Sequence, residues 1–385
     1  MSWTGDTKSK TIMSVFWNSH IKNLSPYIPG EQPKDRQFIK LNTNENPYPP
    51  SPKVMEAIQR TANERLRLYP DPDCGDLRKA IAARYGVKPE QVFAGNGSDE
   101  ILAFAFGAFF ESGAESASIL FPDITYSFYP VYADLWSIPY RVIPLNDDFS
   151  INTAQYLMSS GGVVFPNPNA PTGIAVSLND ILSLAEFLEE REKVFILDEA
   201  YIAFSGAGNT QSAVSRINDH PNLLTVHTLS KSASLAGLRV GFAIGDEQLI
   251  EGLCHIRDSF NSYTIDRLAL AAAAAVADAA YYDEINRRVI VTREQTAQSL
   301  RELGFSVLPS EANFLFIKPP YVSGADFFAA LRERGFLTRH FNKDRISGYL
   351  RVSMGTDEEM NAFLDACNEI IKRYISRAGA NQHKQ

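Results

Sequence analysis

The sequence has few of the residues on which disulfide frameworks and metal sites depend. Its 385 residues include three cysteines and six histidines. Cys74, Cys254 and Cys367 are far apart and form no paired motif, and the histidines form no H-E-x-x-H pattern. An odd, sparse set of cysteines is typical of a protein from a reducing compartment. We therefore expect no disulfide framework, no metal site and a cytoplasmic location.

Positive charge and long apolar runs are also scarce. Lysine and arginine number 37 against 45 aspartates and glutamates, a formal net charge of −8. Without a basic surplus to neutralise phosphates, nucleic acid is excluded as the main partner. Residues 1–17 contain no apolar run of signal-peptide length. The most apolar later run, "LALAAAAAVADAA" at 268–280, is short and contains Asp278, so it predicts a buried helix and no membrane span.

What the sequence does contain is an alternation of short apolar strands and helices. Strand patterns such as "ASILF", "GGVVF", "KVFILD" and "NLLTVHT" are separated by loops and by helical segments such as "LNDILSLAEFLEERE". This alternation is typical of an α/β domain whose mostly parallel central sheet is sandwiched by helices. We predict that this large, ligand-binding domain covers residues 41–285.

The remaining residues have different patterns. The segment "EINRRVIVTREQTAQSLRELGF" predicts one long helix, and strand, helix, strand and a final helix follow it. These elements predict a smaller α+β domain at 286–385. The polar residues 1–40 predict an N-terminal arm that joins the small domain.

Polar groups follow four of the strands predicted for the large domain. The turn "GNGSDE" at 95–100 and the loop "PNPNAPTG" at 166–173 each follow one strand, and Asp198 and Lys231 follow two others. In open α/β sheets, ligands bind at the carboxyl ends of the strands. The four strand ends therefore predict one binding site.

Each of these features also has a purely structural interpretation. Asp198 is either a strand-end charge in water or a semi-buried carboxylate held by a cationic partner. Lys231 is either a solvated surface lysine or a Schiff-base lysine whose pKa is lowered by a nearby cation such as Arg239. The "GNGSDE" turn is either a helix start capped by Ser98 or Asp99, or an anion site at a helix N-terminus.

The side chains near Lys231 indicate which ligand the site would bind. Thr228 and Ser230 can donate hydrogen bonds to a phosphate, and Arg239 can bind a phosphate through two parallel hydrogen bonds. A lysine for an aldehyde, an acid for a ring nitrogen and a cup for a phosphate are what pyridoxal 5'-phosphate requires. We therefore predict this cofactor.

Seven motifs, in this order, carry a resemblance to a known family: "LNTNENPYP", "RLYPDP", "GNGSDE", "PNPNAPTG", "DEAY", "TLSK" and "LAGLRVG". They resemble the fold-type I aminotransferases, and among these most closely the histidinol-phosphate aminotransferases, from about residue 20 to residue 375. The resemblance implies a transaminase of histidine biosynthesis. It would interconvert imidazole acetol phosphate and L-glutamate with L-histidinol phosphate and 2-oxoglutarate, so its partners would be a small amino donor and a phosphorylated keto acceptor.

The resemblance also implies a role for each matching residue near the cofactor. Lys231 would bind the aldehyde and move the substrate proton, Asp198 would pair with the ring nitrogen, and Tyr201 would donate to the 3-oxygen. Tyr126 would stack on the ring. The phosphate would be held by the backbone around Ser98 and Asp99 and by Thr228, Ser230 and Arg239.

Further roles concern the substrate and a second subunit. Arg351 would bind the carboxylate of glutamate. Arg339 would either assist with the substrate phosphate or be a surface charge at a strand end, and Tyr48 would either line the substrate side or pack against the neighbouring prolines. Tyr69 would reach the cofactor phosphate of a partner subunit, which implies a homodimer with shared sites.

One position departs from the family pattern. The family usually reads N-N-P-T-G, and its second asparagine touches the cofactor 3-oxygen. This chain has Ala170 at that place. We expect Asn169, one residue earlier, to take over the contact through a shifted backbone.

The sequence leaves more than one function open. A same-fold transaminase for an aromatic or specialised amino acid, or a threonine-phosphate decarboxylase, would share every cofactor residue. A catalytically idle relative that acts as a binding module is disfavoured. A chain freed of catalysis has no physical reason to keep Lys231, Asp198 and Tyr201 together with Arg239.

Overall fold

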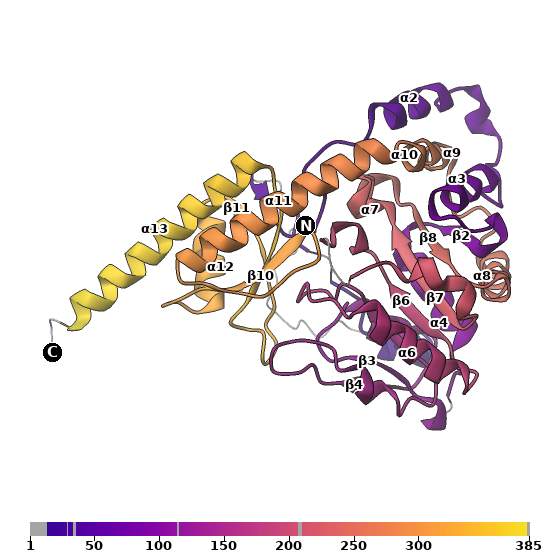
Figure 1. Cartoon of the computed structure of the whole chain (residues 1–385), viewed down its shortest axis with the longest axis horizontal. Coiled ribbons are helices and arrows are strands. Elements are labelled where there is room, and N and C mark those ends of the chain that lie inside the picture. The colour runs from indigo at the N-terminus through magenta and orange to yellow at the C-terminus, as the bar shows by residue number, and fades with distance from the viewer. Residues whose placement is uncertain (1–13, 29, 34–35, 114, 207–209, 383–385) are drawn as a thin grey trace.

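A seven-stranded sheet dominates the computed structural model, which describes residues 14–28, 30–33, 36–113, 115–206 and 210–382 (Figure 1). The strand order is β2-β8-β7-β6-β5-β3-β4. Strands β7, β6, β5, β3 and β4 are parallel, and β8 is antiparallel to both β2 and β7. The mostly parallel sheet predicted from the sequence is therefore confirmed. The strands are Val92–Gly95 (β2), Ile119–Pro122 (β3), Tyr140–Ile143 (β4), Val163–Pro166 (β5), Phe195–Asp198 (β6), Leu223–Thr228 (β7) and Gly241–Ile244 (β8).

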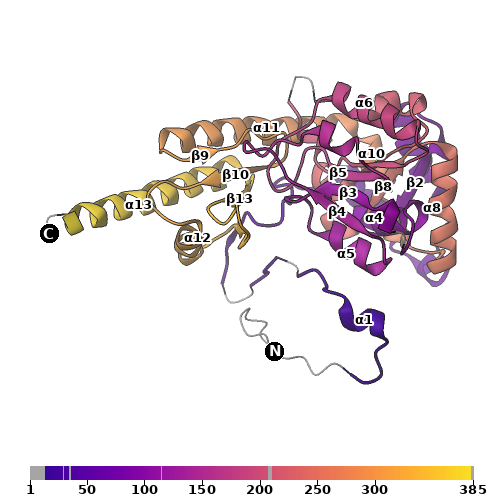
Figure 2. The ribbon, with the colours of Figure 1, turned by 90° about the horizontal axis from the view of Figure 1, so that it is seen from below.

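Both faces of this sheet are covered by helices. Successive side chains of each strand point to opposite faces, so each strand contributes to two hydrophobic cores. Val163 and Phe165 of β5 belong to the hydrophobic core under α6, whereas Val164 belongs to the core under α4, α5 and α8. Figure 2 shows the two helical layers on either side of the sheet. Burial on both faces explains why these strands are continuously apolar. The covering helices are Gly75–Tyr85 (α3), Leu178–Glu189 (α6) and Ala273–Ala277 (α10) on one face, and Gly97–Phe109 (α4), Phe128–Leu135 (α5) and Glu247–Phe260 (α8) on the other.

A second, antiparallel sheet of four strands has the order β12-β13-β10-β9. The short strand β1 (Ile39–Lys40) pairs in parallel with β11, so the last residues of the arm join this part of the molecule. The long helix α13 projects beyond the rest of the protein at its C-terminal end (Figures 1 and 2). The elements of this part are Ser306–Val307 (β9), Phe314–Lys318 (β10), Gly324–Glu333 (α12), Phe336–Leu337 (β11), Arg339–His340 (β12), Leu350–Ser353 (β13) and Asp357–Gln382 (α13).

Helix α11 (Ala279–Glu302) connects the two sheets. Its first turns contribute Tyr282 and Ile285 to a core of the large sheet, and its last turns contribute Ala297 and Leu300 to the core of the small one. The domain boundary predicted at residue 285 thus falls inside one continuous helix. The division at this boundary stays a prediction.

The alanine-rich run at 268–280 does not form the single helix that the sequence predicted. It is divided among α9 (Arg267–Leu270), α10 and the start of α11. Asp278 ends α10 in a non-helical conformation, and its carboxylate accepts hydrogen bonds from Ser51 and Lys53. Alanine favours a helix, but its side chain makes no contacts that would hold the helix against competing interactions. The polar contacts of Asp278 therefore determine the break between α10 and α11. Within the described residues, no helix is long and apolar enough to cross a membrane.

The described residues before α3 form three short helices, and the first of them connects to the large part of the protein by a polar contact. His20 of α1 hydrogen-bonds the carbonyl of Leu135 at the end of α5, with 3.0 Å between Nε2 and O. The arm therefore contacts the large part of the protein as well as β11, with which β1 forms a separate two-stranded sheet. The three helices are Ser19–Asn23 (α1), Pro52–Thr61 (α2) and Glu64–Arg67 (η1).

Candidate active site

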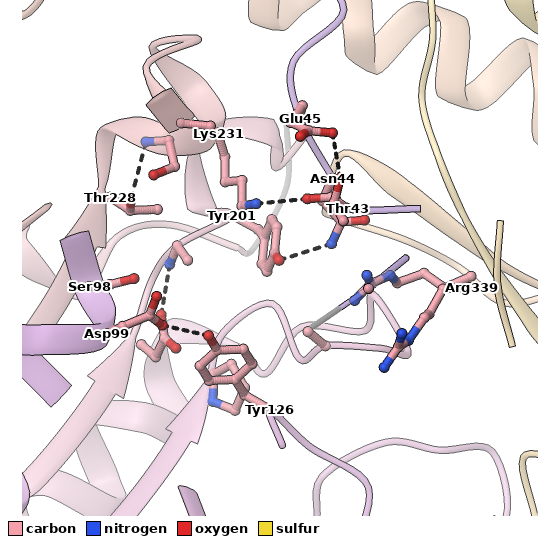
Figure 3. A pocket seen from close by; sticks show the side chains of 18 of the residues that line it. Thr43, Asn44, Glu45, Ser98, Asp99, Tyr126, Tyr201, Thr228, Lys231 and Arg339 are labelled. Atoms are coloured by element: carbon pink, nitrogen blue, oxygen red, sulfur yellow. Dashed lines mark hydrogen bonds between the residues drawn. The ribbon is translucent and has the colours of Figure 1, made fainter. Parts of the chain in front are cut away.

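Several strands of the large sheet end at a cavity of about 260 Å³ (Figure 3). Strand β5 ends at Pro166, β6 ends at Asp198, and β7 leads into the one-turn helix α7 (Leu229–Ser232) that contains Lys231. The far wall comes from the small sheet and from the segment before α2. Eleven residues proposed from the sequence line this cavity: Ser98, Asp99, Tyr126, Asp198, Tyr201, Thr228, Ser230, Lys231, Arg239, Arg339 and Arg351.

Lys231 projects into the cavity from α7. Thr228 caps this helix, and its Oγ1 accepts from the Ser230 amide at 3.1 Å. The Lys231 ammonium donates to the carbonyl oxygen of Thr43 at 2.9 Å. Burial, assisted by the positive charge of Arg351, lowers the pKa of Lys231 to about 8. A much larger share of this amine is neutral near pH 7.5 than for a surface lysine, and the neutral amine is the nucleophile.

Asp198 is a buried carboxylate at the end of β6. Its Oδ2 accepts from the Tyr129 hydroxyl at 3.2 Å, and its Oδ1 accepts from the amide of Ala200 at 3.1 Å. Burial raises the pKa of Asp198 to about 7. Among the described residues it forms no ion pair. A buried carboxyl group that faces a cavity without a cation of its own fits a ligand that carries one.

An anion-binding corner lies next to Lys231. The Arg239 guanidinium donates to Ser230 Oγ at 3.3 Å and contacts the Asp99 carboxylate at 3.2 Å. The start of β8 touches the turn before α4. A Cβ atom on Gly241 would lie 2.5 Å from the Ser98 nitrogen. The free N–H groups at the start of α4 can bind an anion here. Of the two interpretations of this turn, the one in which Ser98 or Asp99 caps the helix does not hold, because the N-cap is Asn96.

Tyr126 forms another wall of the cavity. Its hydroxyl donates to Asp99 Oδ1 at 2.5 Å, and burial raises the pKa of the Tyr126 hydroxyl. Its ring packs edge to face against Tyr129, with ring centroids 5.8 Å apart. The bond to Asp99 and the contact with Tyr129 together hold the Tyr126 ring in one orientation, as a stacking surface requires.

Two arginines of the small sheet face the strand ends. Arg339 on β12 pairs directly with Arg351 on β13 in the antiparallel register. Arg351 donates to the Asn42 carbonyl at 3.0 Å, and its Nε is buried without a hydrogen-bond partner among the described residues. Burial lowers the pKa of Arg351. Like charges directly opposite one another are unfavourable, so this pair fits an anionic ligand that would bind both.

The sequence analysis missed the polar stretch "NTNE" at 42–45. All four of its residues line the cavity, and the same stretch holds both Lys231 and Tyr201. The density of asparagine and proline in this stretch indicates an ordered loop but not its place in the fold. Tyr27 of the arm also lines the cavity, and its ring packs on Phe128 with centroids 4.2 Å apart. No local signal in the arm could have predicted this position.

Asn169 lies behind the cavity wall, and Ala170 forms the wall instead. The Asn169 amide donates to the Ile124 carbonyl at 3.0 Å and to Thr172 Oγ1 at 3.1 Å. These bonds hold the loop in shape. The structure therefore corrects the expectation that Asn169 takes over the contact of the missing asparagine, because its amide is turned toward the protein interior.

Tyr48 and Tyr69 also lie outside the cavity lining. The Tyr48 ring packs between the two cores, with the Arg288 guanidinium 4.1 Å from its centroid. Its role on the substrate side stays a prediction. Tyr69 is 76% exposed and stacks on Tyr263 with centroids 4.5 Å apart. In this chain it reaches no part of the site.

Comparisons with known proteins agree with this geometry. A family model described as aminotransferase class I and II matches residues 36–367. The chain is 51% identical over 360 residues to a histidinol-phosphate aminotransferase of Clostridium acetobutylicum, covering 93% of this chain and 100% of that protein. It is 49% identical over 360 residues to one from Clostridium beijerinckii, covering 93% and 98%.

Solved structures resemble the fold. A histidinol-phosphate aminotransferase from Sinorhizobium meliloti in complex with pyridoxal 5'-phosphate superposes with a TM-score of 0.82 and 23% identity, covering 94% of this chain and 99% of that one. An aspartate aminotransferase from Thermus thermophilus with maleate gives 0.75 and 19% identity, covering 87% and 92%. At these identities the likeness shows the fold alone, and the fold is the predicted fold-type I.

Proposed function

The chain belongs to the aminotransferase class I and II family and is an enzyme, and we propose that it interconverts imidazole acetol phosphate and L-glutamate with L-histidinol phosphate and 2-oxoglutarate. We propose pyridoxal 5'-phosphate as its cofactor. The single observation that carries the substrate proposal is the 51% identity, over 93% of this chain, to a protein named histidinol-phosphate aminotransferase. An aromatic transaminase or a threonine-phosphate decarboxylase finds no such support among these relatives.

The residues at the cavity fit this cofactor. Asp198 is a buried carboxylate without a cation, the corner at Arg239 and Ser230 offers donors to a phosphate, and Lys231 has a lowered pKa. Tyr126 would provide the stacking surface for the ring. When bound, pyridoxal 5'-phosphate supplies an aldehyde for attachment of amines and a ring that withdraws electrons.

The chain's own side chains then do three kinds of work. Lys231 Nζ acts as the amine and as the base that accepts a proton from the substrate α-carbon, for which a pKa near the working pH is favourable. Asp198, in its ionised form, would keep a proton on the ring nitrogen. Arg239 would hold the phosphate end, so that the reacting atoms stay aligned with Lys231.

The two arginines of the small sheet explain how one site could accept two different substrates. L-Glutamate carries an α-carboxylate, and histidinol phosphate carries a phosphate and lacks that carboxylate. Arg351 and Arg339, paired on neighbouring strands, offer a broad cationic wall that either anion can contact. In an alternating reaction the first product leaves before the second substrate binds, so the two anions can use the same arginines in turn.

A panel of single-turnover reactions tests the substrate proposal. The purified protein, loaded with cofactor, is mixed separately with histidinol phosphate, phenylalanine, tyrosine and threonine phosphate. We expect histidinol phosphate to change the absorption band of the bound cofactor at least about tenfold faster than the others, because phenylalanine and tyrosine lack its phosphate and threonine phosphate lacks its imidazole. A faster change with phenylalanine, or decarboxylation of threonine phosphate, would contradict the proposal.

We also propose a homodimer in which Tyr69 contacts the cofactor phosphate of the partner subunit. Its support is the surface around Tyr69: this residue is 76% exposed, and Leu66, Leu68 and the stacked Tyr263 are exposed as well. Exposed apolar side chains in one region mark an association surface. The sharing of sites would explain why Tyr69 contributes nothing to the cavity of its own chain.

Subunit mixing tests the shared site. Tyr69→Ala and Lys231→Ala are each expected to be nearly inactive as homodimers. If the sites are shared, a dimer with one subunit of each variant should regain about half of the activity of a wild-type dimer. One of its two sites then contains both a native Tyr69 and a native Lys231. A Tyr263→Ala variant, which alters the residue beneath Tyr69, serves as the packing control. Mixed dimers without any gain over the homodimers would refute the sharing.

Two further predictions remain proposals. We propose that residues 41–285 form the cofactor-binding domain and residues 286–385 the small domain, with the arm of residues 1–40. This division is supported by a cavity lined from both sheets. We propose a cytoplasmic location on the basis of the sparse cysteines.

A further inference from the structure

The Tyr201 hydroxyl has an unusual polar environment at the cavity. The wall formed by Pro166 and Ala170 offers no side-chain hydrogen-bond donor. The Tyr201 hydroxyl instead accepts a hydrogen bond from Asn44 Nδ2 at 2.9 Å, which Figure 3 shows from the side of the cavity. Within the part of the chain that the structure describes, no acceptor for the Tyr201 proton is present.

Asn44 is held firmly in place. It is only 1% exposed and has a left-handed backbone with φ of 56°. Its backbone N–H donates to Ser353 Oγ at 2.9 Å, and its backbone carbonyl oxygen accepts from Asn313 Nδ2 at 3.0 Å. Asparagine tolerates this backbone conformation better than most residues, so the side chain is delivered to Tyr201 without a large cost in strain.

The hydrogen bonds fix which end of the Asn44 amide faces Tyr201. Ser353 Oγ accepts from the Asn44 backbone, and its own proton is donated to Asn44 Oδ1 at 2.8 Å. Turning the amide over would leave the Ser353 proton without an acceptor among the described residues. Nδ2 is therefore the group that faces the phenol, and Tyr201 must use its oxygen to accept.

We propose that Asn44 is a positioning residue for Tyr201: by donating to the phenolic oxygen, it commits the hydroxyl proton to the cavity. This inference rests on the proposed cofactor, whose 3-oxygen would receive that proton. Ala170 has no side-chain donor, so the hydrogen bond to the 3-oxygen would come from Tyr201. The bond from Asn44 keeps the Tyr201 hydroxyl proton pointed at the cavity. A donor to a hydroxyl also makes that hydroxyl a better donor in turn.

Binding of the cofactor and of an analogue that lacks the 3-hydroxyl, 3-deoxypyridoxal 5'-phosphate, tests the inference. Dissociation constants for both are measured by spectroscopic titration of the wild type, Asn44→Gly and Asn44→Asp. Glycine keeps the left-handed backbone and removes the amide. Aspartate keeps the shape but accepts the Tyr201 proton. We expect the affinity for pyridoxal 5'-phosphate to fall about tenfold in both variants, and the affinity for the analogue to change less than about twofold.

Asn169→Ala is the matched control, because it removes a buried amide next to the cavity that faces away from it. It is expected to change both dissociation constants by the same factor. Equal losses for both ligands in the Asn44 variants, or no loss for either, would overturn the inference while leaving the proposed function intact. A wild type that binds neither ligand would overturn the proposed function itself. If Asn44→Asp fails to fold, Asn44→Gly carries the test.

Discussion

Replacing Lys231 by alanine is expected to lower kcat by about 10⁴-fold or more, because one residue is proposed to provide both the amine and the proton-transfer group. The amine is placed by α7 and by the Thr43 carbonyl, 2.9 Å from Nζ, and burial has already lowered its pKa to about 8. The variant should still bind pyridoxal 5'-phosphate through Arg239 and Asp198. Its absorption spectrum should be that of the free aldehyde, and borohydride should no longer fix the cofactor to the chain.

Two controls separate the lost amine from a damaged cavity. Lys231→Arg keeps the positive charge but cannot form the covalent link, so it should be as inactive as the alanine variant. Small amines such as methylamine, added to Lys231→Ala, should restore activity in part, since removal of the side chain leaves room for them. Wild-type rates in Lys231→Ala, or a covalent adduct at another lysine, would refute the assignment.

Replacing Asp198 by asparagine is expected to lower kcat by about 10³-fold, because a buried carboxylate beside a cationic ring is a strong, charge-assisted contact that an amide cannot replace. Asparagine has nearly the same shape: its oxygen can accept from the Ala200 amide, and its Nδ2 can donate to the Tyr129 hydroxyl oxygen. The holoenzyme should therefore fold normally while the bound cofactor loses its ring proton. Absorption spectra and single-turnover rates with L-glutamate measure both effects.

The same substitution should stabilise the protein without cofactor. Burial raises the pKa of Asp198 to about 7 in the folded chain, above its ordinary value of 3.8. The folded state then binds a proton more tightly than the unfolded state, so this carboxyl group destabilises the apoprotein increasingly as the pH rises from about 4 to 7. Asparagine removes that cost. Melting temperatures of the apoproteins should differ most above pH 7 and converge below pH 4.

Glu199 provides the matched control for Asp198. It is the next residue, and burial raises its pKa to about 7 as well. Its carboxylate accepts from Ser212 and from the Ala213 amide, and it does not line the cavity. Glu199→Gln should alter apoprotein stability with little effect on the rate. A rate loss as large as that of Asp198→Asn would mean that burial of any acid there, and not contact with the ring, is what matters.

Asp198 follows the apolar run "VFIL", and Lys231 comes shortly after "LLTVHT", a strand whose residues are all buried, which is why the sequence could place both at strand ends. Such runs are buried on both faces of a parallel sheet, so the residue after the run must emerge at the carboxyl edge. The two strands lie side by side in the sheet, with Asp198 opposite Val226, which brings the acid and the lysine to the same cavity. Their roles stay predictions that the substitutions above test.

Sequence spacing could not predict which side chains of irregular segments face the cavity, as three cases show: Asn169, Tyr48 and the "NTNE" stretch. Adjacent residues of an irregular loop can point to opposite sides, so Ala170 lines the cavity while Asn169 binds the loop interior. Tyr48 lies outside the cavity lining and contacts Arg288, a residue 240 positions away that no local spacing indicates. The contact between Asn44 and Tyr201 joins residues 157 positions apart, and no local pattern carries it.

By itself the sequence determined the alternation of elements, the parallel sheet, the strand-end residues and the family, because these depend on local propensity, burial period and ordered motifs. Only the tertiary structure decided which loop side chains face the cavity, where α11 passes between the two sheets, and how Asn44 reaches Tyr201. Those features depend on distances between segments far apart in the chain, which are set by how the two sheets pack and not by any residue's neighbours in sequence.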